Sequence, residues 1–173
     1  MDLPSIEFIK LKSAAADSLN GYILKPGAME KGEEYPLLMF VYGGPGSQQV
    51  VDKMSRYYWW FQMLAEQGYA AFAIDLYGQG IRPETTEESE AESSKLYSDR
   101  ETMRQRLFAG LQEAQNLPGI DGSRVVAMGY CFGGASVLEL ARAGAEIECI
   151  RGRSSSGSDG GSDDFYPNRG RDQ

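Results

Sequence analysis

The stretch "VVAMGYCFGGASVLELARAG", residues 125–144, decides the fold of this chain. It begins as a short apolar run, which is typical of a strand buried in a parallel sheet. It continues with apolar residues at helical spacing and reaches Gly144, a common helix stop. Cys131 stands between these two halves, with Gly129 and Gly133 close on either side. The pattern predicts a tight strand-to-helix turn that presents the cysteine at the carboxyl end of a sheet.

Outward from this turn, strand and helix patterns alternate along the chain. Apolar or alternating runs predict strands at 6–12, 19–26, 35–42, 69–78 and 145–150. Helical spacing predicts one helix over 55–67 and another that starts at Ser98, where Glu101 completes a capping-box pattern. The glutamates between residues 84 and 92 are expected to form a solvated surface. This alternation is that of an α/β fold with a mainly parallel sheet.

The last 23 residues have a different character. Residues 151–173 are rich in Ser, Gly, Asp and Arg and contain only two aromatic side chains. Such a segment buries too little apolar surface to offset its chain entropy, so the sequence predicts a disordered tail. We therefore expect one folded domain over residues 1–150, whose sheet is incomplete at its C-terminal side.

The composition excludes several classes of partner. The chain has 173 residues and a net charge of −8, which argues against nucleic acid and anionic membrane surfaces, because both need a basic face. No apolar run reaches the roughly 18 residues of a membrane span, and the N-terminus lacks the pattern of a signal peptide. Two cysteines do not make a disulfide framework. The expected location is the cytoplasm.

The predicted turn has the features of a site for nucleophilic catalysis. The helix that starts behind Cys131 favours negative charge and hence a thiolate. The backbone N–H of Phe132 would point at an oxyanion that forms beside the sulfur. The alternative is a buried structural cysteine at a glycine-rich helix start, since cysteine is among the most buried residue types. The usual base for such a nucleophile is histidine, and the sequence contains none.

Three segments resemble the dienelactone hydrolase family, a branch of the α/β-hydrolases with a Cys-His-Asp triad. They are "GYAAFAIDLYGQGIRPETTEE" (68–88), "DRETMRQRLFAGLQEA" (99–114) and "GIDGSRVVAMGYCFGGASVLELARAGAEI" (119–147). The resemblance implies that Cys131 attacks the carbonyl of a small ester or lactone, with the Phe132 N–H in the oxyanion hole. The family also holds a substrate carboxylate with an arginine near the "DLY" loop. Arg82 is an offset candidate for that role, and a solvated loop arginine is the alternative.

Residues 1–67 resemble a different α/β-hydrolase branch. "YPLLMFVYGGPGSQQV" (35–50) and the following "WWFQMLAEQGY" (59–69) are similar to the catalytic domain of the prolyl oligopeptidase and dipeptidyl-peptidase family, which uses a serine nucleophile. This resemblance implies that the Tyr42 hydroxyl donates to the oxyanion. A strand-end aromatic that fills the sheet edge is the alternative. The two resemblances meet near Gly68 without disturbing the expected strand order.

In both families the acid and the histidine follow the nucleophile along the chain. Here the corresponding region is the predicted tail, and none of its aspartates follows a strand. The sequence therefore predicts a formed turn and oxyanion hole, slow acylation, and a stalled thioester. The shortened sheet predicts marginal stability, self-association through an incomplete edge, or dependence on a partner that completes it.

Together these features favour an impaired hydrolase of dienelactone hydrolase type that acts on a small ester or lactone and needs no cofactor. No set of metal ligands is recognisable, because histidine is absent and only one cysteine is well placed. Two alternatives remain open. One is a non-catalytic remnant or binding module of the α/β-hydrolase fold, and the other is a serine-peptidase-like hydrolase.

Overall fold

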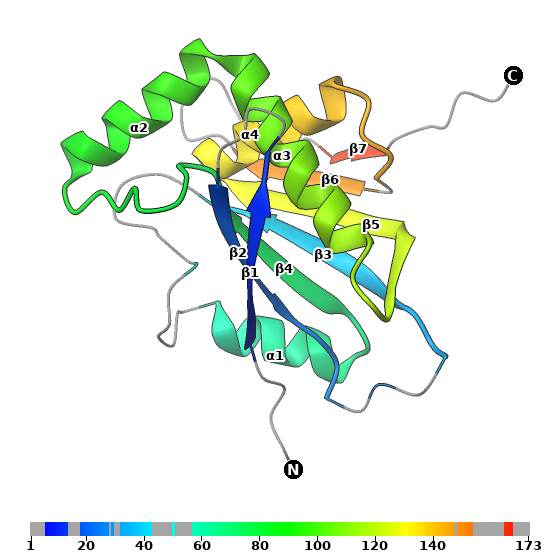
Figure 1. Ribbon diagram of the computed structural model, residues 1–173. Coiled ribbons are helices and arrows are strands. Elements are labelled where there is room, and N and C mark those ends of the chain that lie inside the picture. Colours follow the sequence, from blue (N-terminus) through cyan, green and yellow to red (C-terminus); the bar gives the residue numbers. More distant parts are fainter. Residues whose placement is uncertain are drawn as a thin grey trace, which may run out of the picture.

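A single twisted sheet forms the centre of the computed structural model shown in Figure 1. The structure describes residues 6–13, 18–27, 29, 32–42, 50, 57–147, 149–153 and 165–167. The strands are β1 (Ile6–Lys12), β2 (Ser18–Leu24), β3 (Tyr35–Val41), β4 (Ala70–Asp75), β5 (Ile120–Tyr130), β6 (Cys149–Arg153) and β7 (Phe165–Pro167). The helices are α1 (Tyr58–Glu66), α2 (Thr86–Ser98), α3 (Arg100–Gln115) and α4 (Phe132–Arg142).

The order of the strands in the sheet is β1-β2-β4-β3-β5-β6-β7. Its centre is parallel, because β3 pairs in parallel with both β4 and β5, and β6 pairs in parallel with β5. The flanking pairs β1–β2, β2–β4 and β6–β7 are antiparallel. All six residues of β4 are buried, as expected for a strand covered on both faces. The predicted α/β class is confirmed, and the sheet, which was expected to be mainly parallel, is mixed, with a parallel centre and antiparallel flanks.

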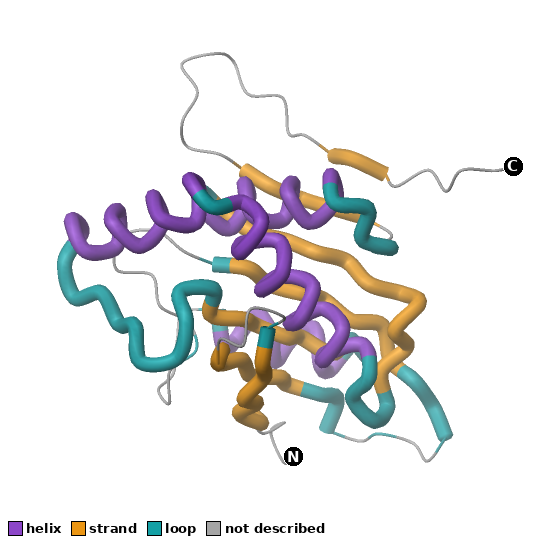
Figure 2. Tube along the Cα trace, turned by 45° about the horizontal axis from the view of Figure 1, so that its top comes forward, coloured by secondary structure: helices purple, strands orange, loops and turns teal. Residues whose placement is uncertain are grey.

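Helices cover both faces of the sheet, as Figure 2 shows. On one face α3 and α4 pack against a core that includes Met103, Leu107 and Val137. On the other face α1 contributes Phe61 and Ala65 to a second, aromatic-rich core. The helical spacing predicted for residues 55–67 is therefore met by a helix whose buried side faces the sheet.

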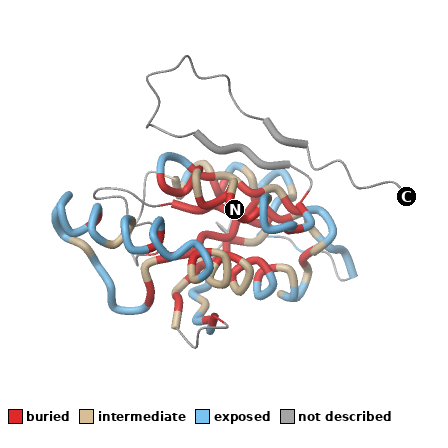
Figure 3. The backbone as a smooth tube through the Cα atoms, turned by 90° about the horizontal axis from the view of Figure 1, so that it is seen from above, coloured by how far each residue is buried: buried red, intermediate tan, exposed pale blue. Residues whose placement is uncertain are grey.

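The largest departure from the sequence prediction lies in the glutamate-rich segment. Residues 86–98 form α2, which is mostly exposed and buries only Ser89 and Leu96 (Figure 3). Its capping box joins Thr85 and Glu88, not Ser98 and Glu101. The helix that follows starts at Arg100, with Asp99 accepting a hydrogen bond from the Thr102 N–H at 3.0 Å. The predicted capping box at Ser98 was therefore wrong, because Ser98 is the last residue of α2.

The last central strand also differs from the sequence prediction. The sequence places it at 145–150, whereas β6 occupies Cys149–Arg153 beside β5. Residues 165–167 form the short strand β7. The remainder of 154–173 lies outside the described residues, so the expected disorder there stays a prediction, as does the domain boundary at residue 150. Within the part of the chain that the structure describes, no helix is long and apolar enough to span a membrane.

Candidate active site

The strand-to-helix turn predicted around Cys131 is present. Strand β5 ends at Tyr130, α4 begins at Phe132, and Cys131 lies between them with φ 54° and ψ −119°. Among the described residues it is the one non-glycine residue with a positive φ. Residues other than glycine adopt such a conformation only at an energetic cost, and strain of this kind concentrates at functional sites. The Cys131 side chain is exposed, so the turn presents the thiol to solvent.

The two glycines beside Cys131 are required by close backbone contacts. A Cβ added at Gly129 would lie 2.3 Å from the carbonyl carbon of Gly133. A Cβ added at Gly133 would lie 2.1 Å from the carbonyl oxygen of Val41 and 3.1 Å from the Cα of Tyr42. The end of β3 therefore touches the first turn of α4 directly. Both positions must therefore be small, as the tight turn predicted around Cys131 requires.

The ring of Phe132 packs against the rings of two tyrosines. Its ring is 2 % exposed and lies 5.7 Å from the ring of Tyr77 and 5.3 Å from that of Tyr97, centroid to centroid. Tyr77 follows β4, and Tyr97 lies in the last turn of α2. Sequence reasoning missed both residues. The position of Tyr77 at the carboxyl end of a buried strand was an available indication, whereas Tyr97 reaches the site only through the packing of α2.

The other two candidate residues follow the neighbouring strands β3 and β4. Tyr42 follows β3, is 6 % exposed, and accepts a hydrogen bond from the Val50 N–H at 3.0 Å through its hydroxyl oxygen. Its backbone is next to Gly133, which brings it close to the turn. Arg82 is exposed in the loop between β4 and α2. Gln79, which precedes Arg82 by three residues in the same loop, donates its backbone N–H to the carbonyl oxygen of Ser18 at 2.7 Å.

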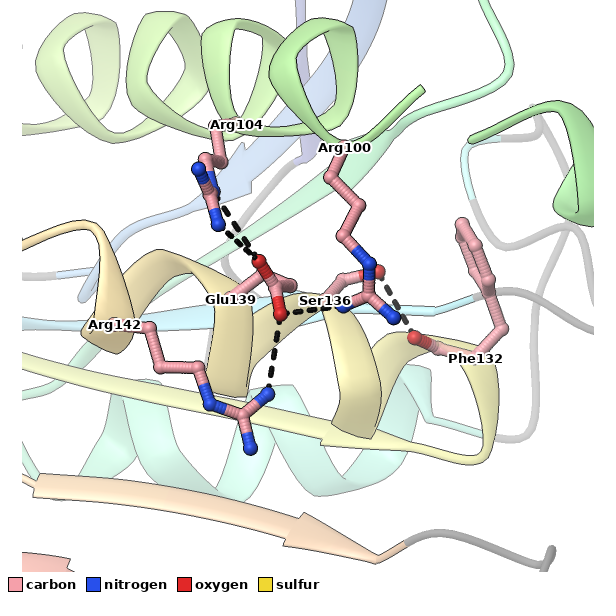
Figure 4. A network of polar contacts seen from close by, with 6 residues as sticks. All are labelled: Arg100, Arg104, Phe132, Ser136, Glu139 and Arg142. Atoms are coloured by element: carbon pink, nitrogen blue, oxygen red, sulfur yellow. Dashed lines mark hydrogen bonds and ion pairs between the residues drawn. The ribbon is translucent and has the colours of Figure 1, made fainter. Parts of the chain in front are cut away.

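A buried carboxylate holds α4 against α3 (Figure 4). Glu139 is 3 % exposed and accepts hydrogen bonds from Arg104 at 2.8 Å and Arg142 at 3.1 Å, with a third ion pair to Arg100. Burial opposes the charged form of Glu139. Hydrogen bonds from Arg104 and Arg142, together with the charge of Arg100, outweigh burial and lower the pKa of Glu139. One turn earlier, the Ser136 hydroxyl donates to the carbonyl oxygen of Phe132 at 2.9 Å.

A cleft of about 580 Å³ lies beside the site, between the loop after β4 and the α2–α3 junction. Its walls combine apolar and polar side chains and carry both signs of charge. They include Gln79, Lys95, Asp99, Thr102 and Arg106. Tyr77 lines this cleft and also contacts Phe132, so it separates the cleft from the turn that carries Cys131. Arg82 is not among the lining residues, although its neighbour Ile81 is.

The sheet and its strand-to-helix turn are those of an α/β-hydrolase-type fold, and comparison with known proteins assigns the family. Residues 53–150 match the model of the dienelactone hydrolase family, which is more than half of the chain. The chain therefore belongs to the dienelactone hydrolase family. In structure it is similar to a dienelactone hydrolase-like promiscuous phosphotriesterase from metagenomic libraries, with 28% identity and a TM-score of 0.69. That match covers 86% of this chain and 59% of the other.

The chain is also similar to dipeptidyl peptidases, as the resemblance of residues 1–67 implied. Dipeptidyl-peptidase 5 of Porphyromonas gingivalis is 29% identical over 131 residues, which cover 76% of this chain and 18% of that protein. The crystal structure of dipeptidyl peptidase 4 from the same organism gives a TM-score of 0.66 at 28% identity, over 86% of this chain and 20% of the other. The chain thus spans less than a fifth of the length of dipeptidyl-peptidase 5.

Proposed function

We propose that this protein is a hydrolase of small esters or lactones that uses Cys131 as its nucleophile. The observation that carries the proposal is the conformation of Cys131, an exposed cysteine held at φ 54° immediately before α4. The positive end of the α4 dipole favours negative charge at this position. A strained, exposed cysteine at a helix start has no evident packing role, which argues against the alternative of a buried structural residue.

In the proposed reaction the Cys131 thiolate attacks the carbonyl carbon of the ester. The backbone N–H of Phe132 and, as a second donor, the hydroxyl of Tyr42 would stabilise the resulting oxyanion. The carbon–oxygen bond of the ester then breaks, leaving a thioester on Cys131 and an alcohol or, from a lactone, a tethered hydroxyl. Water would complete the cycle by attacking the thioester. Arg82 is a secondary candidate for contact with a carboxylate on the substrate.

The absence of histidine from the sequence bears on the second half of this cycle. Without a positioned base, water attacks a thioester slowly, and loss of one triad member typically lowers rates by several orders of magnitude. We therefore propose that acylation of Cys131 proceeds and that hydrolysis of the thioester limits turnover.

Intact-mass spectrometry tests this proposal directly. The purified chain is mixed with excess p-nitrophenyl butyrate, and the mass is followed over time beside a Cys131→Ser control. We expect a butyryl adduct on the wild-type chain that persists for many minutes and is absent or much slower in the control. Rapid loss of the adduct with continued product release would show efficient turnover and overturn the proposed impairment. Equal labelling of both chains would support the non-catalytic alternative.

The dipeptidyl peptidase relatives favour a second candidate, cleavage of a peptide amide at the same site. An amide has a poorer leaving group than an activated ester and depends more strongly on a general acid. A dipeptidyl p-nitroanilide distinguishes the two functions. Cys131-dependent release of p-nitroaniline would favour the peptidase, and we expect none under conditions where the ester acylates Cys131.

A further inference from the structure

Tyr97 packs against the residue that follows Cys131. It belongs to the last turn of α2, and its ring meets the ring of Phe132 edge to face at 84°. Phe132 is the residue that follows Cys131, so this contact holds Tyr97 beside the turn. The Tyr97 side chain is nevertheless 40% exposed, in contrast to the buried Phe132 ring. The Tyr97 side chain is therefore partly accessible to a molecule in solvent.

The electrostatic surroundings keep this hydroxyl protonated. Partial burial raises the pKa of Tyr97 above 10.0, and the nearby charge of a Cys131 thiolate raises it further. The guanidinium of Arg100 acts in the opposite direction and is the weaker influence. Mutual repulsion between a phenolate and a thiolate requires that the two side chains lie close enough to sense each other's charge. At neutral pH Tyr97 is thus an O–H donor beside the turn that carries Cys131.

Acylation of a thiol by an ordinary ester needs such a donor. When the tetrahedral intermediate collapses, a thiolate leaves more easily than an alkoxide, so the intermediate returns to the reactants unless the alkoxide is protonated. Histidine supplies this proton in the triad mechanism. This sequence contains no histidine, so another side chain must supply the proton if esters with basic leaving groups are to react.

We propose that Tyr97 is a catalytic residue, whose hydroxyl protonates the leaving alkoxide during acylation of Cys131. This inference rests on the proposed function. As the bond from the carbonyl carbon to the ester oxygen breaks, the Tyr97 O–H transfers its proton to that oxygen. The products are the Cys131 thioester, a neutral alcohol and a Tyr97 phenolate, which regains a proton from water. Because the leaving alkoxide is protonated in this step, the substrates include esters of unactivated alcohols as well as activated esters.

Esters that differ only in the leaving group test this role. The full-length chain is treated with p-nitrophenyl butyrate, whose leaving group needs no acid, and with 2,2,2-trifluoroethyl butyrate, whose leaving group is much more basic. The rate of Cys131 acylation is measured by intact mass for wild type, Tyr97→Phe and Tyr77→Phe. Tyr97→Phe preserves the ring contact with Phe132. Tyr77→Phe removes the hydroxyl of the other tyrosine that contacts Phe132, which donates to the Ser89 carbonyl at 3.5 Å, and is the matched control.

We expect Tyr97→Phe to slow acylation by the trifluoroethyl ester about 100-fold, the lower end of the range for a positioned general acid. Acylation by the p-nitrophenyl ester should change less than about threefold, and Tyr77→Phe should leave the ratio of the two rates unchanged. Equal losses with both esters in Tyr97→Phe would indicate a structural role and overturn the inference. If the p-nitrophenyl ester acylates the wild-type chain and the trifluoroethyl ester does not, the role of Tyr97 is overturned, whereas the role of Cys131 as the nucleophile is retained. Acylation by neither ester would overturn the proposed function as well.

Discussion

At the scale of single residues, the local sequence around Cys131 carried most of the information about the site. The flanking glycines could be predicted because a strand-to-helix turn forces backbone atoms together, and the contacts of Gly129 and Gly133 bear this out. The tyrosines on Phe132 could not be predicted in the same way. Tyr97 is 35 positions away from Phe132 and reaches it only because the last turn of α2 lies beside the first residue of α4. Nothing in its local sequence specifies that contact.

Gly133, in the first turn of α4, and Gly144, just after the end of α4, allow a steric cost to be compared with a conformational cost. Gly133→Ala places a methyl group 2.1 Å from the Val41 carbonyl oxygen, and we expect it to lower the free energy of unfolding by about 3 kcal/mol, near the top of the usual range for overpacking. Gly144→Ala meets no atom within 4 Å but keeps φ at 86°, and should cost about 1 kcal/mol. Urea unfolding measures both. An equal loss of stability in the two variants would mean that β3 moves aside and that the contact between β3 and α4 is not rigid.

At the scale of the elements, helix α2 shows why the sequence prediction failed where it did. The helix carries charged and uncharged polar side chains over most of its surface and buries only Ser89 and Leu96, so it lacks the apolar stripe on which helix prediction depends. The pair Thr85 and Glu88 was a readable capping box, but the later pair at Ser98 and Glu101 has the same spacing. Only the structure shows that the first pair caps α2 and that Asp99 separates α2 from α3.

Helix α4 depends on the buried carboxylate that ties it to α3. Glu139→Gln leaves three guanidinium groups around a neutral amide, and we expect it to lower the free energy of unfolding by about 2 kcal/mol at pH 7. This is less than for a fully buried ion pair, because Arg100 and Arg142 are half-exposed or more. Glu113→Gln, at an exposed position of α3, is the charge-matched control and should be nearly neutral.

The pH dependence of the stability difference between wild type and Glu139→Gln identifies the origin of that difference. The pKa of Glu139 is lowered in the folded chain, so its stabilising contribution is complete above the ordinary value of 4.5 and is lost as the pH falls through the folded pKa. Wild type and Glu139→Gln should therefore differ at pH 6 and converge toward pH 3 in thermal unfolding. A difference that stays constant with pH would assign the loss to packing and not to the carboxylate charge.

At the scale of the whole molecule, the alternation of strands and helices was enough to predict the α/β class but not the course of the sheet. A buried apolar run identifies a central strand, yet it does not say which neighbour the strand pairs with. The antiparallel pairing of β2 with β4 and the place of β3 between β4 and β5 emerge only from the structure. Self-association through a sheet edge stays a prediction. On the β1 edge Lys10 and Lys12 oppose it, since charged residues on edge strands discourage pairing.

The strand order also determines how the two segments with different family resemblances depend on each other. Strands β2 and β3 come from residues 1–67, and both are hydrogen-bonded to β4, which comes from the second segment. Strand β3 is also paired with β5, so neither segment contains a complete sheet or closes its own core. We therefore expect separate fragments 1–67 and 68–173 to lack a cooperative unfolding transition, whereas the intact chain unfolds in one.

Tryptophan fluorescence and circular dichroism in the far ultraviolet measure the unfolding of the two segments separately. Both tryptophans, Trp59 and Trp60, lie in α1 and report on the first segment, whereas most helical signal comes from α2, α3 and α4 in the second. Coincident urea transitions for the two signals in the intact chain, and their recovery when the two fragments are mixed, are the expected results. A cooperative transition in fragment 68–173 alone would show that β4 and β5 form a stable sheet without β3 between them, which would contradict the dependence that the strand order implies.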